Sequence, residues 1–206
     1  MSPRTYNLGK REAAASETRG RILAAAREIL ANESATSDLS MEGIARRADV
    51  SRLTIYYQFK SRHGLLEALY DELARRGNMH RMGEVFREPE PSLALEKLVR
   101  TFIGFWSSDP VVIRRLRGMA ALDAEMAAGI QARDARRLHI AREVLGRTTE
   151  FTKIKGGVEN RNLAASVLSM LTSFETYDAL SRAGHSEQEI TATVIGLARV
   201  AVGFGS

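Results

Sequence analysis

The segment Leu39–Leu66 constrains the fold of this chain more than any other stretch of its sequence. Two short helical patterns flank a tight turn. Ser40 is suited to cap the first, because its hydroxyl can accept a hydrogen bond from a first-turn amide. Apolar residues then recur at three- and four-residue spacing, which marks one buried helix face: Met41, Ile44, Ala45 and Ala48. Asp49 stands where the chain must turn, since Asp visits left-handed conformations at modest cost. Ser51 can cap the helix that follows.

The second helix has a polar, aromatic and basic outer face. Ile55 and Phe59 are expected to point inward at four-residue spacing. The remaining side chains lie on or beside the exposed side: Arg52, Leu53, Thr54, Tyr56, Tyr57 and Lys60. A solvent-facing helix rarely needs two adjacent tyrosines, whereas a helix in a DNA groove can use both. The pattern therefore predicts a helix-turn-helix over about residues 40–59.

The sequence resembles the DNA-binding domain of TetR-type (tetracycline-repressor-like) transcriptional regulators. The resemblance rests on Ile44–Ser51, Thr54–Ser61 and the pair Leu65 and Leu66, and it covers roughly Thr18–Gly77. It implies an all-α fold, with an N-terminal three-helix helix-turn-helix DNA-binding domain and a C-terminal helical domain for ligand binding and dimerisation. The partners it implies are a palindromic double-stranded DNA operator, a small-molecule effector and a second copy of the chain. Most members of the family are repressors.

Carried over by position, the resemblance implies a set of DNA-contacting residues: Ser40, Arg52, Thr54, Tyr56, Tyr57 and Lys60. Ser40 would meet phosphate at a helix N-terminus, and Lys60 would contact phosphate just past the recognition helix. Tyr56 has an alternative role, namely packing against the first helix of the motif.

Four positions depart from the family pattern without removing the fold. Asp49 replaces the usual Gly, Leu53 replaces a small residue, Gln58 replaces the common His, and Arg62 replaces the common Lys. Leu53 and Gln58 belong to the recognition helix, so no operator sequence can be transferred from relatives.

Composition favours a DNA-binding protein over an enzyme. Residues 1–62 hold 11 Lys and Arg against 7 Asp and Glu, while residues 63–206 hold 19 against 18. The positive charge thus accompanies the motif, as phosphate binding requires, although a solvated basic tail is the alternative. With no cysteine, four scattered histidines and no phosphate-binding glycine loop, neither an enzyme nor a resident cofactor or metal is expected. The chain lacks a membrane-spanning apolar run, and a cytoplasmic location is expected.

The chain is expected to comprise a mobile basic arm (1–17), the DNA-binding domain (18–77) and the effector-binding and dimerisation domain (78–206). The first helix would open at Ser16 or Thr18. A helix over 62–76 and a linker over 77–92 follow the motif. Further helices are expected over 92–107, 110–126, 130–151, 158–183 and 186–204.

An effector cavity is expected among bulky or soft side chains of the C-terminal domain: Phe102, Trp106, Met119, His139, Phe174 and Tyr177. Ligand sites between helices are mostly apolar with a few polar anchors. His139 is the candidate anchor, with a half-exposed surface histidine as the alternative. The aromatic residues have an alternative role as ordinary core.

The last two expected helices are apolar on more than one face, so each must bury two faces. One face would meet the monomer core and the other a second copy. The predicted interface comprises Leu163, Val167, Leu171, Ile190, Val194 and Ala198. A larger monomeric bundle remains an alternative. A helical protein–protein interaction module that does not recognise DNA is the alternative function.

Overall fold

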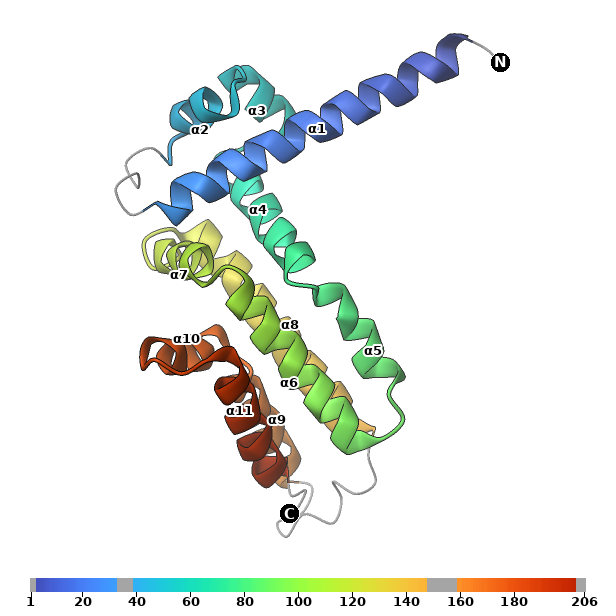
Figure 1. Ribbon diagram of the computed structural model, residues 1–206, viewed down its shortest axis with the longest axis vertical. Helices are drawn as coiled ribbons and strands as arrows, with labels where there is room; N and C mark the ends of the chain where they lie inside the picture. Colours follow the sequence, from blue (N-terminus) through green and yellow to red (C-terminus); the bar gives the residue numbers. More distant parts are fainter. Residues whose placement is uncertain (1–2, 33–38, 148–158, 203–206) are drawn as a thin grey trace. The chain divides into compact units, whose positions relative to one another are not determined.

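The computed structural model describes residues 3–32, 39–147 and 159–202, and the regular elements within these ranges are all helical (Figure 1). The predicted all-α fold is confirmed. The chain divides into two compact units, Met1–Glu72 and Leu73–Ser206. The division lies within α4 (Arg62–Arg76) rather than at the expected boundary after residue 77. Within the described ranges, no helix combines the length and apolarity needed to cross a bilayer.

The first unit is built from α1 (Pro3–Ala31), α2 (Met41–Ala48), α3 (Arg52–Phe59) and most of α4. α1 packs against α2, and α2 packs against α3. The apolar stripes found in the sequence are buried here: Ile22, Ala26, Ile29, Leu30, Ile44, Ala45, Ile55, Phe59, Leu65 and Leu69. These side chains form the core that fixes the recognition helix.

α1 begins at Pro3, well before the expected start at Ser16 or Thr18. Residues 3–17, expected to form a mobile arm, are therefore helical, and Figure 1 shows this part of α1 extending past α2 and α3. Residues 9–17 are exposed, Thr18 is half-buried, and the first buried side chain is Ile22. The apolar stripe in the sequence marked where packing starts, whereas three consecutive alanines at 13–15, which favour helix without burial, continue the helix toward the N-terminus.

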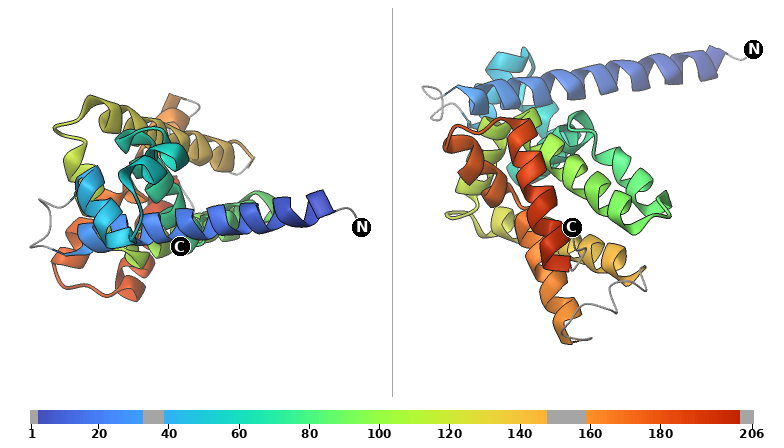
Figure 2. Two further views of the ribbon diagram at one scale, coloured as in Figure 1. Left: turned by 90° about the horizontal axis from the view of Figure 1, so that it is seen from above. Right: turned by 60° about the horizontal axis from the view of Figure 1, so that its bottom comes forward.

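The described residues of the second unit form eight further helical segments. They are η2 (Met79–Arg81), α5 (Met82–Arg87), α6 (Pro91–Ser108), α7 (Pro110–Met119), α8 (Ala124–Gly146), α9 (Glu159–Leu171), α10 (Phe174–Arg182) and α11 (Glu187–Val202). α6 packs against both α5 and α11, while α9 packs against both α8 and α11. Figures 1 and 2 show α11 running beside α9.

Several predicted boundaries are wrong in this unit. The expected linker 77–92 contains η2 and α5, because Met82 and Val85 supply buried apolar anchors. The helix expected over 110–126 ends at Met119, and the next begins at Ala124 rather than at residue 130. Asp123 causes this early start, since its carboxylate accepts hydrogen bonds from the amides of the first turn. The expected ends at 151, 158 and 204 lie outside the described residues.

The helix expected over 158–183 is interrupted at Thr172 and Ser173. The Trp106 indole N–H donates to the Thr172 carbonyl at 2.9 Å, which gives this backbone oxygen a partner outside its own helix. The Thr172 hydroxyl donates back to the Leu168 carbonyl at 2.8 Å. Ser173 then caps α10 by accepting from the Thr176 amide at 3.2 Å. A tertiary hydrogen bond and a new cap together end one helix and start another.

Candidate functional site

The turn between α2 and α3 has the geometry that the sequence predicts. The Ser40 hydroxyl accepts from the Gly43 amide at 3.0 Å and caps α2. Asp49 lies in the left-handed region with φ 52° and ψ 54°. The Val50 amide donates to the Ala45 carbonyl at 3.0 Å, which closes the end of α2. Asp49 therefore takes the conformation for which the family pattern has Gly.

α3 has a cap at each end and a buried inner face. The Ser51 hydroxyl accepts from the Thr54 amide at 3.0 Å. Ile55 and Phe59 are buried, as predicted from their spacing. Lys60 ends the helix with φ 68°, and its amide donates to a carbonyl in the last turn. The helix thus turns its other side to solvent.

Contacts from both sides hold the C-terminal end of α3. A Cβ on Gly64 would lie 2.2 Å from the Phe59 carbonyl oxygen, so only glycine permits the start of α4 to approach this closely. From α1, the Arg19 guanidinium donates to the Gln58 carbonyl at 3.2 Å and lies 4.3 Å from the centre of the Phe59 ring. The Gln58 side-chain amide donates to the Ala15 carbonyl at 3.3 Å. The recognition helix is therefore held by α1 and α4.

The outer face of α3 combines cations with tyrosine rings. Arg52 forms an ion pair with Glu42 of α2, and it donates to the Tyr56 hydroxyl at 3.1 Å. The hydrogen bond to Tyr56 and the Glu42 charge both raise the pKa of Arg52, so the cation persists. Tyr57 is 79% exposed, and the Lys60 ammonium lies 5.4 Å from the centre of its ring. Such a face suits contact with phosphates and base edges.

All six predicted DNA-contact residues lie in the motif, and five belong to α3 or its C-cap. The hydroxyls of Ser40 and Thr54 already have hydrogen-bond partners within the chain. Ser40 accepts from the Gly43 amide, and the Thr54 hydroxyl lies 2.8 Å from the Ser51 hydroxyl. The prediction omitted two residues of this surface. Glu42 holds Arg52, and Leu53 is 77% exposed. The sequence did indicate Leu53, because it is an apolar residue on an otherwise polar helix face.

A comparison with protein families identifies this unit. Residues 22–69 match the model described as bacterial regulatory proteins, tetR family. Residues 22–69 are therefore similar to the N-terminal segment of tetR-family regulators. The matched residues run from the first buried position of α1 into α4 and include the whole helix-turn-helix. The resemblance inferred from the sequence is thereby confirmed.

Solved structures extend the likeness in fold to the second unit. A TetR-like transcriptional regulator from Rhodococcus sp. RHA1 matches with a TM-score of 0.65 at 18% identity, covering 90% of this chain and 96% of that one. A TetR transcription regulator from Haloarcula marismortui gives a TM-score of 0.66 at 15% identity, with 92% and 98% covered. AibR, solved with isovaleryl coenzyme A and operator DNA, gives 0.61 at 18% identity, with 87% and 97% covered. No curated protein matches the chain by sequence.

The aromatic residues expected to line an effector cavity pack against one another in this TetR-type fold. The Trp106 ring centre lies 4.4 Å from that of Phe105, 5.6 Å from that of Phe174 and 6.3 Å from that of Phe102. All four side chains are buried, and the Trp106 indole N–H donates a hydrogen bond to the Thr172 carbonyl. These rings form core, which was the alternative open from the sequence.

The other three predicted effector residues do not share one site. Tyr177 extends the aromatic cluster through Phe174, and burial raises the pKa of its hydroxyl. Met119 is half-buried at the end of α7. His139 is 71% exposed on α8, with Nε2 3.6 Å from a Glu143 carboxylate oxygen. The prediction of His139 as a cavity anchor is wrong, because its side chain faces solvent.

A charged network joins α7, α8, α9 and α10 beside these rings. Asp134 accepts from Arg117 at 3.0 Å and from Arg137 at 2.8 Å. Arg137 also donates to the Ser169 carbonyl at 3.0 Å, and Arg117 contacts Glu175 at 2.6 Å. Burial alone would raise the pKa of Asp134, but the hydrogen bonds from the two arginines outweigh it and lower that pKa. The network stabilises the packing of four helices.

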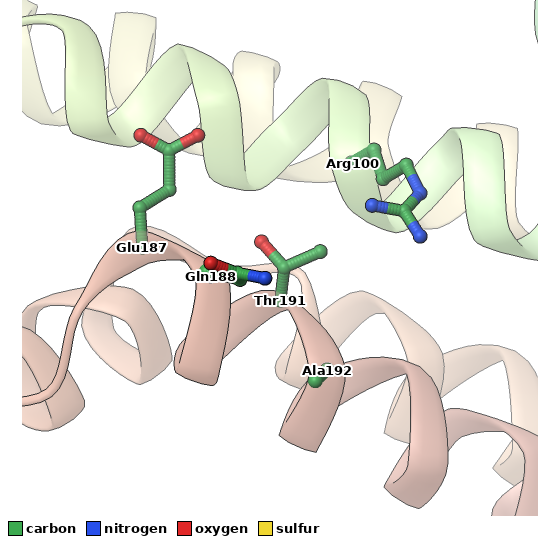
Figure 3. A pocket seen from close by; sticks show the side chains of 5 residues that line it. All are labelled: Arg100, Glu187, Gln188, Thr191 and Ala192. Atoms are coloured by element: carbon green, nitrogen blue, oxygen red, sulfur yellow. The ribbon is translucent and has the colours of Figure 1, made fainter.

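A pocket of about 500 Å³ opens between α6 and α11 (Figure 3). Arg100 comes from α6, while Glu187, Gln188, Thr191 and Ala192 come from α11. Thr191 is buried, and Arg100 and Glu187 supply opposite charges. None of the six residues predicted to bind the effector lines this pocket. Sequence periodicity could not reveal it, because its lining comes from two distant segments.

The predicted dimer residues divide between two faces of α9 and α11. Leu171, Ile190, Val194 and Ala198 are buried within the subunit, so they cannot form an interface with a second copy. Val167 is half-buried, and Leu163 is exposed. The large exposed apolar side chains of the two helices are Leu163 (60%), Met170 (57%), Leu197 (51%) and Val200 (78%). We call these four the exposed apolar face.

Proposed function

We propose that the chain is a homodimeric transcriptional repressor that binds a palindromic DNA operator and is released by a small molecule. The outer face of α3 carries this proposal. Arg52, Tyr57 and Lys60 are exposed on a helix that caps and buried side chains hold in place, within a domain matched by the tetR family model. A rigid exposed helix with cations and aromatic rings is suited to the major groove.

The exposed apolar face supports the homodimer. Leu163 and Met170 lie seven residues apart on α9, which places them on the same side of that helix. Leu197 and Val200 lie three residues apart on the adjacent α11. Four large apolar side chains left in water would be costly, whereas a two-fold axis through this face would bury eight of them. Gly196, which has open space above it, allows the close approach of a second helix.

The palindromic operator follows from the dimer. Two copies related by a two-fold axis present two recognition helices, and these fit half-sites about 34–36 Å apart on one side of the duplex. AibR, whose fold resembles this chain, is a protein solved with both operator DNA and isovaleryl coenzyme A. An effector acts by binding better to a dimer whose recognition helices are wrongly spaced for DNA.

The pocket between α6 and α11 is the effector site that we propose. Its Arg100 cation and Glu187 carboxylate fit the opposite charges of a small zwitterion such as an amino acid, and Gln188 and Thr191 offer further polar groups. α11 also carries Leu197 and Val200, so a ligand in the pocket contacts a helix of the dimer face. This shared helix provides a route from the effector to the subunit arrangement.

Selection from a random duplex pool tests the repressor proposal. Purified chain is incubated with the pool, and bound duplexes are amplified and sequenced over several rounds. We expect an inverted repeat whose half-site centres lie about one helical turn apart. Enrichment of a single half-site would contradict the dimeric mode of binding. Failure to enrich any duplex, with the helical fold intact, would favour the protein–protein interaction module.

Thermal unfolding with the twenty amino acids as probes tests the effector site. We expect one or a few of them to raise the midpoint and to release the selected duplex. Arg100→Ala and Glu187→Gln should abolish both effects. Glu189→Gln is the matched control, because Glu189 lies on the same helix, outside the pocket lining, and hydrogen-bonds Ser186. If an amino acid still raised the unfolding midpoint of both pocket variants, the result would contradict the assignment of this pocket as the effector site.

A further inference from the structure

The recognition helix presents an apolar side chain that neither the core nor the predicted set of DNA contacts explains. Leu53 is the second residue of α3 and is 77% exposed. Tyr57, four residues later and therefore on the same side of the helix, is 79% exposed. Leu53 thus contributes little to the stability of the fold. An exposed leucine beside an exposed ring forms an apolar strip along the helix.

The polar side chains beside this strip already have partners. Arg52 is held by Glu42 and by the Tyr56 hydroxyl. The Thr54 hydroxyl is engaged with Ser51 at 2.8 Å. These contacts limit the polar groups that the first turn of α3 can offer to base edges, although the first turn is the part of a recognition helix that contacts bases. Leu53 remains as a large side chain without a partner in that turn.

A leucine side chain can distinguish bases in the major groove only by apolar contact. It has no donor or acceptor, so it cannot hydrogen-bond to the N7, O6, N6 or O4 atoms of the bases. The C5-methyl group of thymine is the apolar group displayed there, and apolar side chains recognise it by contact.

We propose that Leu53 is a specificity-determining residue that recognises a thymine methyl group in each half-site of the operator. The inference rests on the proposed DNA-binding function. Tyr57 packs beside the same base step and shields the methyl contact from water. Burying one methyl group contributes about 0.8 kcal/mol, so its loss should weaken binding about fourfold for one half-site and about fifteenfold for both.

Replacement of thymine by deoxyuridine tests the proposal, because it removes the methyl group and leaves every base pair intact. Each thymine of the duplex selected by the wild-type chain is replaced in turn, and Kd is measured at fixed salt. We expect one thymine per half-site at which the replacement weakens binding about fourfold. Leu53→Ala, which removes the contact in both half-sites, should bind the thymine duplex about fifteenfold more weakly and should no longer distinguish it from the deoxyuridine duplex.

Two controls make the result specific to Leu53. Leu53→Met retains an apolar side chain of similar size and should keep the preference for thymine. Tyr57→Ala should weaken binding while leaving a preference for thymine at the same position. Equal binding of all deoxyuridine duplexes by the wild-type chain would overturn the proposal, as would an unchanged thymine preference in Leu53→Ala. Failure of the selection itself would instead refute the proposed DNA-binding function.

Discussion

A glutamate at Val200 should separate the subunits without unfolding them. Val200 is 78% exposed and belongs to the exposed apolar face with Leu163, Met170 and Leu197. Burying a whole side chain of this kind contributes about 1.5–3 kcal/mol, so burying the exposed part contributes about 1–2 kcal/mol. Two-fold symmetry places each contact in the interface twice.

The expected effect of Val200→Glu follows from this symmetry. The substitution removes about 1.5 kcal/mol of apolar burial from each subunit and places two carboxylates in a desolvated interface. Together these terms should weaken the dimer by about 5 kcal/mol, which corresponds to a roughly 5,000-fold higher dissociation constant. Sedimentation velocity over a concentration series measures that constant, and circular dichroism checks that the helices remain.

Two variants of the same helix serve as controls for Val200→Glu. Gln188→Glu adds the same charge on the side that faces the α6 pocket and should leave the dimer intact. Val194→Glu places the charge at a fully buried position and should unfold the subunit instead. A wild-type monomer at micromolar concentration would refute the reasoning. So would a Val200→Glu variant that dimerises as tightly as the wild type.

Two further substitutions test the DNA surface and the charged network. Lys60→Ala should weaken binding to selected and random duplexes alike and should reduce the slope of log K against log salt by about 1. Fluorescence anisotropy would measure both effects. A loss of affinity confined to the selected duplex would contradict a phosphate contact. Asp134→Asn should lower the free energy of unfolding by about 2 kcal/mol in urea titrations, less than for a fully buried pair because the Asp134 side chain is 33% exposed. The folded-state pKa of Asp134 is lowered, so its stabilisation is present above the unfolded-state pKa and is lost as pH falls through the folded-state pKa. Wild type and Asp134→Asn should therefore converge in stability at acid pH, and a gap that persists there would argue against the ion pairs as its cause.

The helix-turn-helix could be predicted because local chemistry determines it. Ser40 and Ser51 cap α2 and α3, and Asp49 takes the left-handed conformation that the turn demands. The inward positions of Ile55 and Phe59 follow from helical spacing alone. The start of α1 could not be predicted in the same way. An apolar stripe marks burial, and an exposed helix carries no such stripe.

The second unit depends on contacts that connect distant segments. The break between α9 and α10 involves a hydrogen bond from Trp106, 66 residues away from Thr172 in sequence. The sequence shows that α11 has two apolar faces, but not that Val194 faces the core while Val200 faces solvent. Pocket lining and core packing favour the same residue types, so the aromatic cluster around Trp106 could not be distinguished from a cavity. His139 was misplaced for the related reason that helical spacing does not reveal which side of α8 is covered.

Binding of a selected duplex over a range of salt concentrations tests the central claim most directly. Fluorescence anisotropy would compare the selected duplex with a scrambled duplex of the same composition, using the wild-type chain. We predict that the selected duplex binds at least about a thousandfold more tightly at physiological salt, and that affinity for both duplexes falls steeply as salt rises. Equal affinity for the two duplexes, or no measurable binding to either, would contradict sequence-specific DNA recognition by this chain.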